Sequence, residues 1–310
     1  MRGMATGAVL ALAMAAAPAA AQDSAQHWEQ CANKDNAFTP DLQIGGCTAL
    51  IQSGRETAAN MATAFHNRGI AYGRKGEMDR AIPDFDQAIR LNPNDALAFY
   101  NRGIAYNRKG EADRAIQDYD QAIRLNPNYA SAFYNRGTAY NRKGEADRAI
   151  QDFDQAIRLN PNHAGAFNNR GTAYSGKGQF DRAIQDYNQA IRLNPNHANA
   201  FNNRGAAYER KGEVDRAIQD YGQAIRLDPN QANAFNNRGI AYTKQRRLPQ
   251  AIADFDAALR LDPKMAVALY GRGMAHRLAG NVAAGDADIA AALAIDPQVA
   301  GELARRGLTP

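Results

Sequence analysis

The stretch ALAFYNRGIAYNRKGEADRAIQDYDQAIRLNPNY, residues 96–129, contains two helical patterns of similar length. In the first pattern Phe99, Gly103 and Tyr106 recur at spacings of four and three residues, which places them on one face of a helix. The small glycine allows a second helix to approach closely, and the rings fill the space around the contact. The second pattern carries an equivalent face, formed by Ala115, Tyr119 and Ala122. The stretch therefore predicts a helical hairpin.

Glycine and proline mark where the two helices end. Gly110 follows the first pattern, and glycine tolerates the left-handed conformation that stops a helix. Pro127 follows the second pattern, where it cannot continue the helix. One hairpin cannot bury its apolar face alone, so hairpins of this kind must stack on their neighbours.

The hairpin recurs along the chain with a period of 34 residues. Residues 62–299 form seven consecutive units without insertion, which predicts an all-α solenoid of stacked helical hairpins. The clearest marker is the tripeptide Asn-Arg-Gly, which the seventh unit replaces by Gly-Arg-Gly at residues 271–273. It begins at Asn67, Asn101, Asn135, Asn169, Asn203 and Asn237.

This pattern resembles the tetratricopeptide repeat (TPR), a family whose motif has a large residue, Gly, Tyr, Ala, an aromatic residue, Ala and Pro in this order. The first unit matches the motif with Phe65, Gly69, Tyr72, Ala81, Phe85, Ala88 and Pro93. The seventh unit departs from it at His276, Gly285 and Ile289, and we expect it to be the less closely packed end. The resemblance implies a right-handed superhelix whose first helices line the concave surface.

Both ends of the chain differ from the repeats. Residues 1–21 have the features of a signal peptide, because Arg2 precedes an Ala-rich apolar run and a small-residue cleavage site. A retained anchor is the alternative, but the run is shorter than the roughly 18 apolar residues of a membrane span. Residues 22–61 are expected to form a degenerate capping hairpin, and residues 300–310 a short capping helix. We therefore expect an exported protein without a membrane span, in the periplasm or outside the cell.

The only two cysteines, Cys31 and Cys47, lie before the repeats. Counted back by one period, they fall on the two facing helices of the predicted capping hairpin. An even number of cysteines in an exported chain favours a disulfide over free thiols or a metal site. A metal would need more ligands than two cysteines and the nearby His27 provide.

Each unit has an arginine before the glycine of its first helix and an aspartate 16 residues later. An arginine binds a carboxylate through two parallel hydrogen bonds, so this spacing predicts an ion pair within or between hairpins. A row of ligand-binding arginines is the weaker alternative, because the carboxylates would neutralise it. Arg306 has no downstream aspartate and is expected to be exposed to solvent. The central pairs are Arg102 with Asp118, Arg136 with Asp152, and Arg170 with Asp186.

The asparagines of the recurring tripeptide are the candidate binding residues. The resemblance implies that they point to the concave surface, where an amide that donates and accepts suits the backbone of an extended peptide. The alternative is that these amides only bond neighbouring first helices. The predicted peptide-binding residues are Asn67, Asn101, Asn135, Asn169, Asn203 and Asn237, with aromatic contacts from Tyr100, Tyr134 and Tyr270.

Basic residues gather where the first helices end. They favour an acidic protein partner, or they only compensate the negative end of each helix dipole. The formal net charge of +5 is spread over the chain without a run of basic and aromatic residues, and an export signal argues against a nucleic-acid partner. The basic residues include Arg74, Lys75, Arg108, Lys109, Arg142 and Lys143.

The sequence contains no recognisable constellation of catalytic residues. The five histidines are scattered over different units, and no glycine loop follows a strand, so we expect neither an enzyme nor a cofactor. The sequence predicts a non-catalytic scaffold that binds an extended polypeptide segment on its concave surface. The alternative is a structural subunit or assembly factor of a cell-envelope complex that uses its convex face or its ends.

Overall fold

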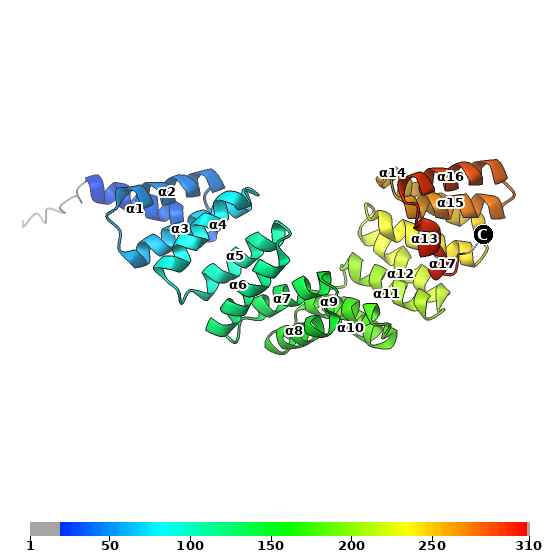
Figure 1. Ribbon diagram of the computed structural model, residues 1–310, viewed down its shortest axis with the longest axis horizontal. Helices are drawn as coiled ribbons and strands as arrows, with labels where there is room; N and C mark the ends of the chain where they lie inside the picture. The colour runs from blue at the N-terminus through cyan, green and yellow to red at the C-terminus, as the bar shows by residue number, and fades with distance from the viewer. Residues whose placement is uncertain (1–18, 309–310) are drawn as a thin grey trace, which may run out of the picture. The chain divides into compact units, whose positions relative to one another are not determined.

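The computed structural model describes residues 19–308, which form seventeen α-helices and one short 3₁₀ helix, with no strand among these residues (Figure 1). The predicted all-α class is confirmed. The signal peptide predicted for residues 1–21 lies outside the described part, except that α1 begins at Ala19. Within residues 19–308 no helix combines the length and the apolar composition of a membrane span.

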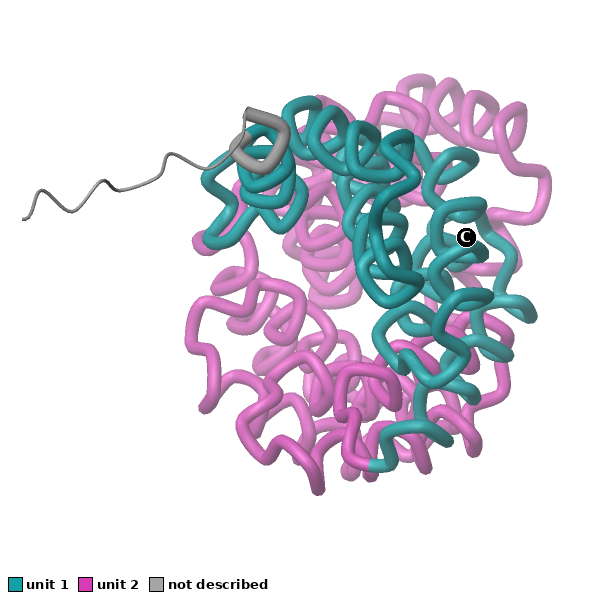
Figure 2. The backbone as a smooth tube through the Cα atoms, turned by 90° about the vertical axis from the view of Figure 1, so that its left-hand side faces the viewer, with its two compact units in different colours: residues 1–127 teal, residues 128–310 magenta. Residues whose placement is uncertain are grey.

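The chain divides into two compact units, residues 1–127 and residues 128–310 (Figure 2). The first unit contains three stacked hairpins. Each of its helices packs on the next, and the first helices of neighbouring hairpins also contact one another. The helices are α1 (Ala19–Ala32), α2 (Pro40–Ser53), α3 (Ala58–Arg74), α4 (Met78–Leu91), α5 (Ala96–Arg108) and α6 (Ala112–Leu125).

The second unit contains five stacked hairpins and a short last helix. Its first helices also contact one another in series, and we call the surface that the first helices form in each unit the first-helix surface. The helices are α7 (Ala130–Arg142), α8 (Ala146–Leu159), α9 (Ala164–Gly176), α10 (Phe180–Leu193), α11 (Ala198–Arg210), α12 (Val214–Leu227), α13 (Ala232–Lys244), α14 (Leu248–Leu261), α15 (Ala266–Leu278), α16 (Val282–Ile295) and α17 (Val299–Arg305).

A glycine in each first helix lets the two helices of a hairpin touch. At Gly205, an added Cβ would lie 2.8 Å from the ring of Tyr221 and 3.2 Å from the carbonyl oxygen of Ala217. No larger residue fits this position unless a neighbour shifts. The same contact joins Gly103 with Tyr119 and Gly171 with Tyr187, and all three tyrosines are buried. The spacing of glycine and aromatic residue in the sequence therefore determines how each hairpin closes.

The last repeat hairpin, α15 and α16, closes through smaller residues. Gly285 replaces the usual alanine, and a Cβ added there would lie 2.7 Å from the carbonyl oxygen of Gly273. The outer side of α16 is largely exposed, and Leu293 and Ile295 are among its exposed apolar residues. The outer side of α16 is exposed because no further hairpin among the described residues stacks on it.

A disulfide joins the first two helices. Cys31 on α1 and Cys47 on α2 are bonded, with 2.06 Å between their sulfur atoms. Both cysteines are fully buried, and Leu50 and Ala64 belong to the same buried cluster. Since α1 and α2 also both contact α3, the bond ties the two helices together at the start of the stack.

An arginine and an aspartate form a bidentate ion pair in each of the seven repeat hairpins. Arg170 donates from Nε and Nη2 to the two carboxylate oxygens of Asp186, at 2.8 and 2.6 Å. Its Nη1 donates to Asp154 of the preceding hairpin at 2.6 Å, so the guanidinium also links neighbouring hairpins. Asp186 is only 6 % exposed. Its hydrogen bond to Arg170 raises the pKa of this guanidinium above its usual range.

The other six pairs have the same geometry. Each guanidinium is already hydrogen-bonded to a carboxylate. These arginines therefore hold hairpins together and do not form a row of unpaired cations that could bind a ligand. The pairs are Arg68 with Asp84, Arg102 with Asp118, Arg136 with Asp152, Arg204 with Asp220, Arg238 with Asp254, and Arg272 with Asp288.

Candidate functional site

A chain of side-chain amides crosses the first-helix surface of the second unit. Within α9 Asn168 donates to Asn169 at 3.1 Å, and within α11 Asn202 donates to Asn203 at 3.4 Å. Between neighbouring first helices, Asn169, Asn203 and Asn237 each donate to the residue 35 positions earlier. These bonds run from Asn169 Nδ2 to Tyr134 Oη (3.1 Å), from Asn203 Nδ2 to Asn168 Oδ1 (3.2 Å), and from Asn237 Nδ2 to Asn202 Oδ1 (3.1 Å). The result is a continuous hydrogen-bonded chain from α13 to α7.

These contacts bear on the two roles that the sequence leaves open for the asparagines. The amides do bond neighbouring first helices. An amide has two donor hydrogens and two acceptor sites, however, so one or two bonds use only part of its capacity. The column residues Asn67, Asn101, Asn135, Asn169, Asn203 and Asn237 are all half-buried, on α3, α5, α7, α9, α11 and α13.

The amide chain ends at α13 because the repeat changes in the next first helix, α15. Gly271 stands where the earlier units have an asparagine, so Asn236 lacks the donor that serves Asn168 and Asn202. The Oδ1 of Asn236 is buried and has no hydrogen-bond partner among the described residues. Buried polar atoms are normally paired, so this oxygen is an unused acceptor at the end of the column.

In the first unit, a histidine takes the place of the hydroxyl or amide acceptor. Asn101 Nδ2 lies 2.8 Å from His66 Nε2. His66 is 8 % exposed, and its ring lies 5.8 Å from that of Phe85. Burial lowers the pKa of His66, and the negative charge of Asp95 only partly opposes this effect. His66 is therefore neutral at pH 7 and accepts the hydrogen bond from Asn101.

We expect the stability of the first unit to fall as the pH drops from about 7 to about 5. The unfolded chain protonates His66 near its ordinary pKa, whereas the folded chain resists protonation until a lower pH, so acid favours the unfolded state. His66→Gln keeps a neutral acceptor and should remove this part of the pH dependence. Hydrogen exchange of α3 and α5 across this range measures the effect. Equal pH dependence in the wild type and the variant would contradict it.

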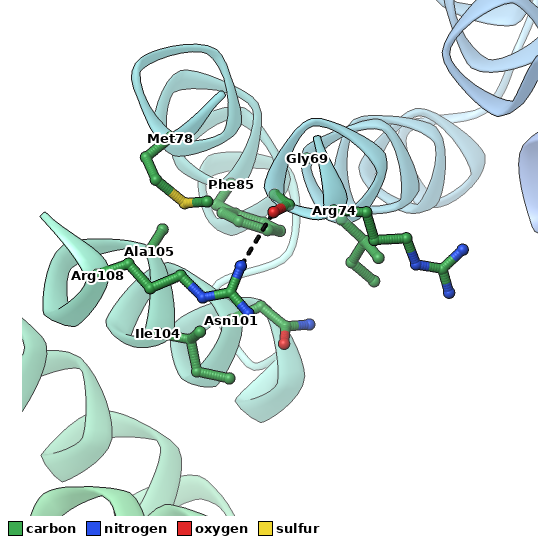
Figure 3. A pocket seen from close by; sticks show the side chains of 10 residues that line it. Gly69, Arg74, Met78, Phe85, Asn101, Ile104, Ala105 and Arg108 are labelled. Atoms are coloured by element: carbon green, nitrogen blue, oxygen red, sulfur yellow. Dashed lines mark hydrogen bonds between the residues drawn. The ribbon is translucent and has the colours of Figure 1, made fainter. Parts of the chain in front are cut away.

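A small apolar pocket lies beside Asn101 on the first-helix surface of the first unit (Figure 3). It has a volume of about 180 Å³. Arg108 of α5 reaches to α3, where its Nη1 donates to the carbonyl oxygen of Gly73 at 3.0 Å. The apolar lining is Ile70, Met78, Phe85, Ile104 and Ala105, and the polar lining is Arg74, Asn101 and Arg108. The guanidinium of Arg74 points away from the pocket and donates to Gln43 and Asn36 (Figure 3). The pocket therefore fits an apolar side chain next to the amide of Asn101 and the guanidinium of Arg108.

Sequence reasoning did not find this pocket, although a signal is present. In the first two units an isoleucine follows the packing glycine, at Ile70 and Ile104. The next three units have Thr138, Thr172 and Ala206 at this position. The apolar lining thus depends on the residue after the packing glycine, which varies between units and is not part of the repeat motif.

The three predicted tyrosine contacts differ in accessibility. Tyr100 and Tyr134 are half-buried on the first-helix surface, and the Tyr134 ring lies 4.5 Å from that of His163. Tyr270 does not offer the accessible ring that the sequence predicts, because it is only 5 % exposed. It belongs to the buried cluster that also contains Leu303 and Leu308 of the chain end. The prediction that Tyr270 contacts a bound peptide is therefore wrong.

The lysines of the basic strip pair with the preceding hairpin. Lys75 Nζ lies 2.6 Å from Asp41, and Lys109 Nζ lies 2.6 Å from Asp79. These ion pairs join successive hairpins, so the lysines have a structural role as well as a surface charge. Arg74 likewise donates to Gln43 and Asn36 of the preceding hairpin, whereas Arg108 lines the pocket.

The structure also corrects the prediction that Arg306 is exposed to solvent. Its side chain is 18 % exposed, and its Nη2 donates to Glu209 at 3.1 Å and to Asn237 Oδ1 at 3.2 Å. Glu209 is buried and also accepts from Lys244 Nζ at 2.7 Å and from the Tyr221 hydroxyl at 2.9 Å. Burial alone would raise the pKa of Glu209, but Arg306, Lys244 and Tyr221 together lower it. Glu209 is therefore a buried, ionised carboxylate at the end of the amide chain.

The first-helix surface of the first unit thus carries the apolar pocket beside Asn101, and that of the second unit carries the amide chain and the buried carboxylate of Glu209. Among residues 19–308 no group of three or more His, Cys, Asp and Glu side chains is placed to hold a metal ion.

Comparisons with known proteins agree with the repeat pattern. Family models of the tetratricopeptide repeat match residues 66–130, 109–164, 168–232 and 232–265. No curated protein matches the chain. Among solved structures, the MamA protein is 29 % identical with a TM-score of 0.50, over 55 % of this chain and 93 % of that one.

Two further structures show similarity of the fold alone. A tetratricopeptide repeat protein from Parabacteroides merdae is 20 % identical with a TM-score of 0.64, over 85 % of this chain and 99 % of that one. A chain of the APC/C hetero-tetramer Cut9-Hcn1 is 18 % identical with a TM-score of 0.66, over 90 % of this chain and 55 % of that one.

Proposed function

This chain belongs to the tetratricopeptide-repeat family, and from that premise we propose that its first-helix surface binds an extended segment of another polypeptide. Proteins of this family bind protein or peptide partners and are in general non-catalytic scaffolds. We accordingly propose a scaffold without enzymatic activity and without a cofactor.

The amide chain on α7 to α13 carries the proposal. Asn169, Asn203 and Asn237 recur at one spacing and lie half-buried on one surface, so they can meet peptide groups at intervals along an extended ligand. The pocket beside Asn101 supports the proposal with a place for an apolar side chain. Arg108 at this pocket favours a ligand with an acidic residue next to the apolar one.

We propose the same division of the chain that the sequence predicts. Residues 1–21 are a signal peptide, residues 22–61 form the N-terminal capping hairpin, residues 62–299 form seven repeat units, and residues 300–310 form the C-terminal cap. The disulfide between Cys31 and Cys47 is compatible with an oxidising compartment, and we place the protein in the periplasm or outside the cell.

The test uses peptides selected from a random library against the chain expressed without residues 1–21. The variant Asn135→Ala/Asn169→Ala is expected to weaken binding of a selected peptide about tenfold or more, because two amides of the column are lost. The matched control is Asn94→Ala/Asn162→Ala, which removes two exposed asparagines in the turns between units and should leave binding unchanged. Fluorescence anisotropy gives the Kd values.

Unchanged binding by the column variant would remove the first-helix surface as the binding site. In that case the alternative, an envelope subunit or assembly factor that binds through its convex face or its ends, would take its place. Circular dichroism of both variants establishes that the comparison is made between folded chains.

A further inference from the structure

The C-terminal segment, residues 299–308, leaves the stack of hairpins and lies on the first-helix surface of the second unit. Its register matches the first helix of an eighth hairpin, which would stack on the outer side of α16. Helix α17 contacts both α15 and α16, but the residues that follow it reach α13, where Arg306 contacts Asn237 and Gly307 lies beside Lys244. The segment thus covers part of the surface that we propose for peptide binding.

Four side chains of this segment are held in place, and the first of them, Val299, is fully buried in the same cluster as the two leucines. Leu303 and Leu308 are 0 % and 5 % exposed and belong to the buried cluster that contains Ile240 and Met274. Arg306 lies between them in sequence and donates to Glu209 and Asn237. The segment therefore binds through a Leu-x-x-Arg-x-Leu pattern, in which one cation stands between two apolar anchors.

The acceptor for this arginine is Glu209, which stands at a position where no other unit has a carboxylate. The side chain of Glu209 is 3 % exposed, and a buried carboxylate requires opposite charge or hydrogen bonds. Lys244 supplies an opposite charge at 2.7 Å, and the Tyr221 hydroxyl supplies a hydrogen bond at 2.9 Å. The equivalent positions of the other units hold Gly73, Asn107, Asn141, Ser175, Thr243 and Arg277.

Arg306 is therefore a second cation on a carboxylate that already has a partner. The ion pair with Lys244 and the hydrogen bond from Tyr221 come from α13 and α12, and neither involves residues 299–308. The guanidinium also donates to Asn237 Oδ1, the carbonyl oxygen of the amide at which the chain begins, which is a group that a bound peptide would meet. The Arg306 side chain therefore lies where the side chain of a bound ligand would lie.

We propose that Glu209 and Asn237 form a receptor site for an arginine side chain of the partner polypeptide, and that Arg306 is its intramolecular occupant. The ligand is a segment with the Leu-x-x-Arg-x-Leu pattern, which displaces residues 299–308 and continues along the amide chain toward α7. This inference rests on the proposed function, because it names the kind of segment that the first-helix surface binds.

A labelled synthetic peptide with the sequence of residues 298–308 tests this proposal against the chain expressed without residues 1–21. Two variant peptides carry Arg305→Ala or Arg306→Ala. Arg305 is exposed in the structure, so the two peptides have equal net charge and differ only in which arginine is lost. The Arg305→Ala peptide should bind like the unaltered one. The Arg306→Ala peptide should bind about tenfold more weakly or worse, since it lacks the charged hydrogen bonds to Glu209 and Asn237.

Variants of the chain give the complementary result. Arg306→Ala in the chain vacates the guanidinium position and should tighten binding of the unaltered peptide about tenfold, whereas Arg305→Ala should not. Hydrogen exchange in residues 299–308 of the wild-type chain should accelerate when the peptide is added. Equal affinities for the two variant peptides would overturn the proposal. So would the absence of peptide binding to a folded Arg306→Ala chain, because the segment would then be a permanent cap.

The outcome is separable from that of the proposed function. If library peptides depend on Asn135 and Asn169 while the 298–308 peptide does not bind, the arginine site fails and the peptide-binding surface stands. If library peptides ignore the column, the proposed function fails whatever the 298–308 peptide does.

Discussion

Replacement of Arg170 by methionine is expected to lower the free energy of unfolding by about 3 kcal/mol. Asp186 is 6 % exposed, and Arg170 donates both of the hydrogen bonds that its carboxylate oxygens receive, at 2.8 and 2.6 Å. Methionine retains apolar bulk but leaves the carboxylate buried without its cation. The loss of the link to Asp154 adds little, because that side chain is 52 % exposed. Urea denaturation followed by circular dichroism measures the change.

Arg182→Met is the matched control for this prediction. Arg182 is an exposed arginine on the second helix of the same repeat hairpin, and its loss should leave the denaturation midpoint nearly unchanged. Adding Asp186→Leu to Arg170→Met should recover most of the lost stability, because the unpaired charge is then gone. If Arg170→Met and Arg182→Met behave alike, the pairs do not stabilise the hairpins.

Removal of the disulfide by Cys31→Ala/Cys47→Ala is expected to cost the first hairpin about 3 kcal/mol. The two cysteines are 16 residues apart in sequence, and a crosslink over a loop of this length mainly restricts the unfolded chain. The effect should be confined to the start of the stack, because each hairpin contacts only its neighbours. Hydrogen exchange in α1 and α2 measures it, with α9 and α10 as an internal reference.

Reduction provides a second route to the same result. Dithiothreitol should accelerate exchange in α1 and α2 of the wild type to the level of the double variant, and it should leave the double variant unaffected. If exchange in the reduced wild type equals that in the oxidised wild type, the disulfide does not hold the two helices together.

The hairpin contacts were the most predictable part of this protein. Helix period brings Gly103 opposite Tyr119 and Arg102 opposite Asp118, and the structure places each of these pairs in contact. Both contacts join residues 16 apart within one hairpin, where a short connection leaves the two helices little freedom. Recurrence at 34 residues repeats the ion pair in all seven units and the contact of glycine with an aromatic ring in the first six.

The binding residues were predictable only in part. The recurrence of asparagine at one position indicated the surface, but it did not indicate that each amide would bond the residue 35 positions earlier. The pocket beside Asn101 depends on Ile70 and Ile104, which differ from their equivalents in the third, fourth and fifth units. A prediction made from the residues that all units share cannot find features that depend on residues that differ between units.

The sequence alone was sufficient for the helical hairpins, their ion pairs and the order in which they stack, because all of these arise between residues at short, repeated separations. The course of the last ten described residues could not be obtained in that way. Their register predicts one more helix of the stack, yet Arg306 meets Glu209, 97 positions away in sequence. A terminal segment with no hairpin partner lies wherever the folded surface offers a buried carboxylate and an apolar recess, and both exist only after the repeats have packed.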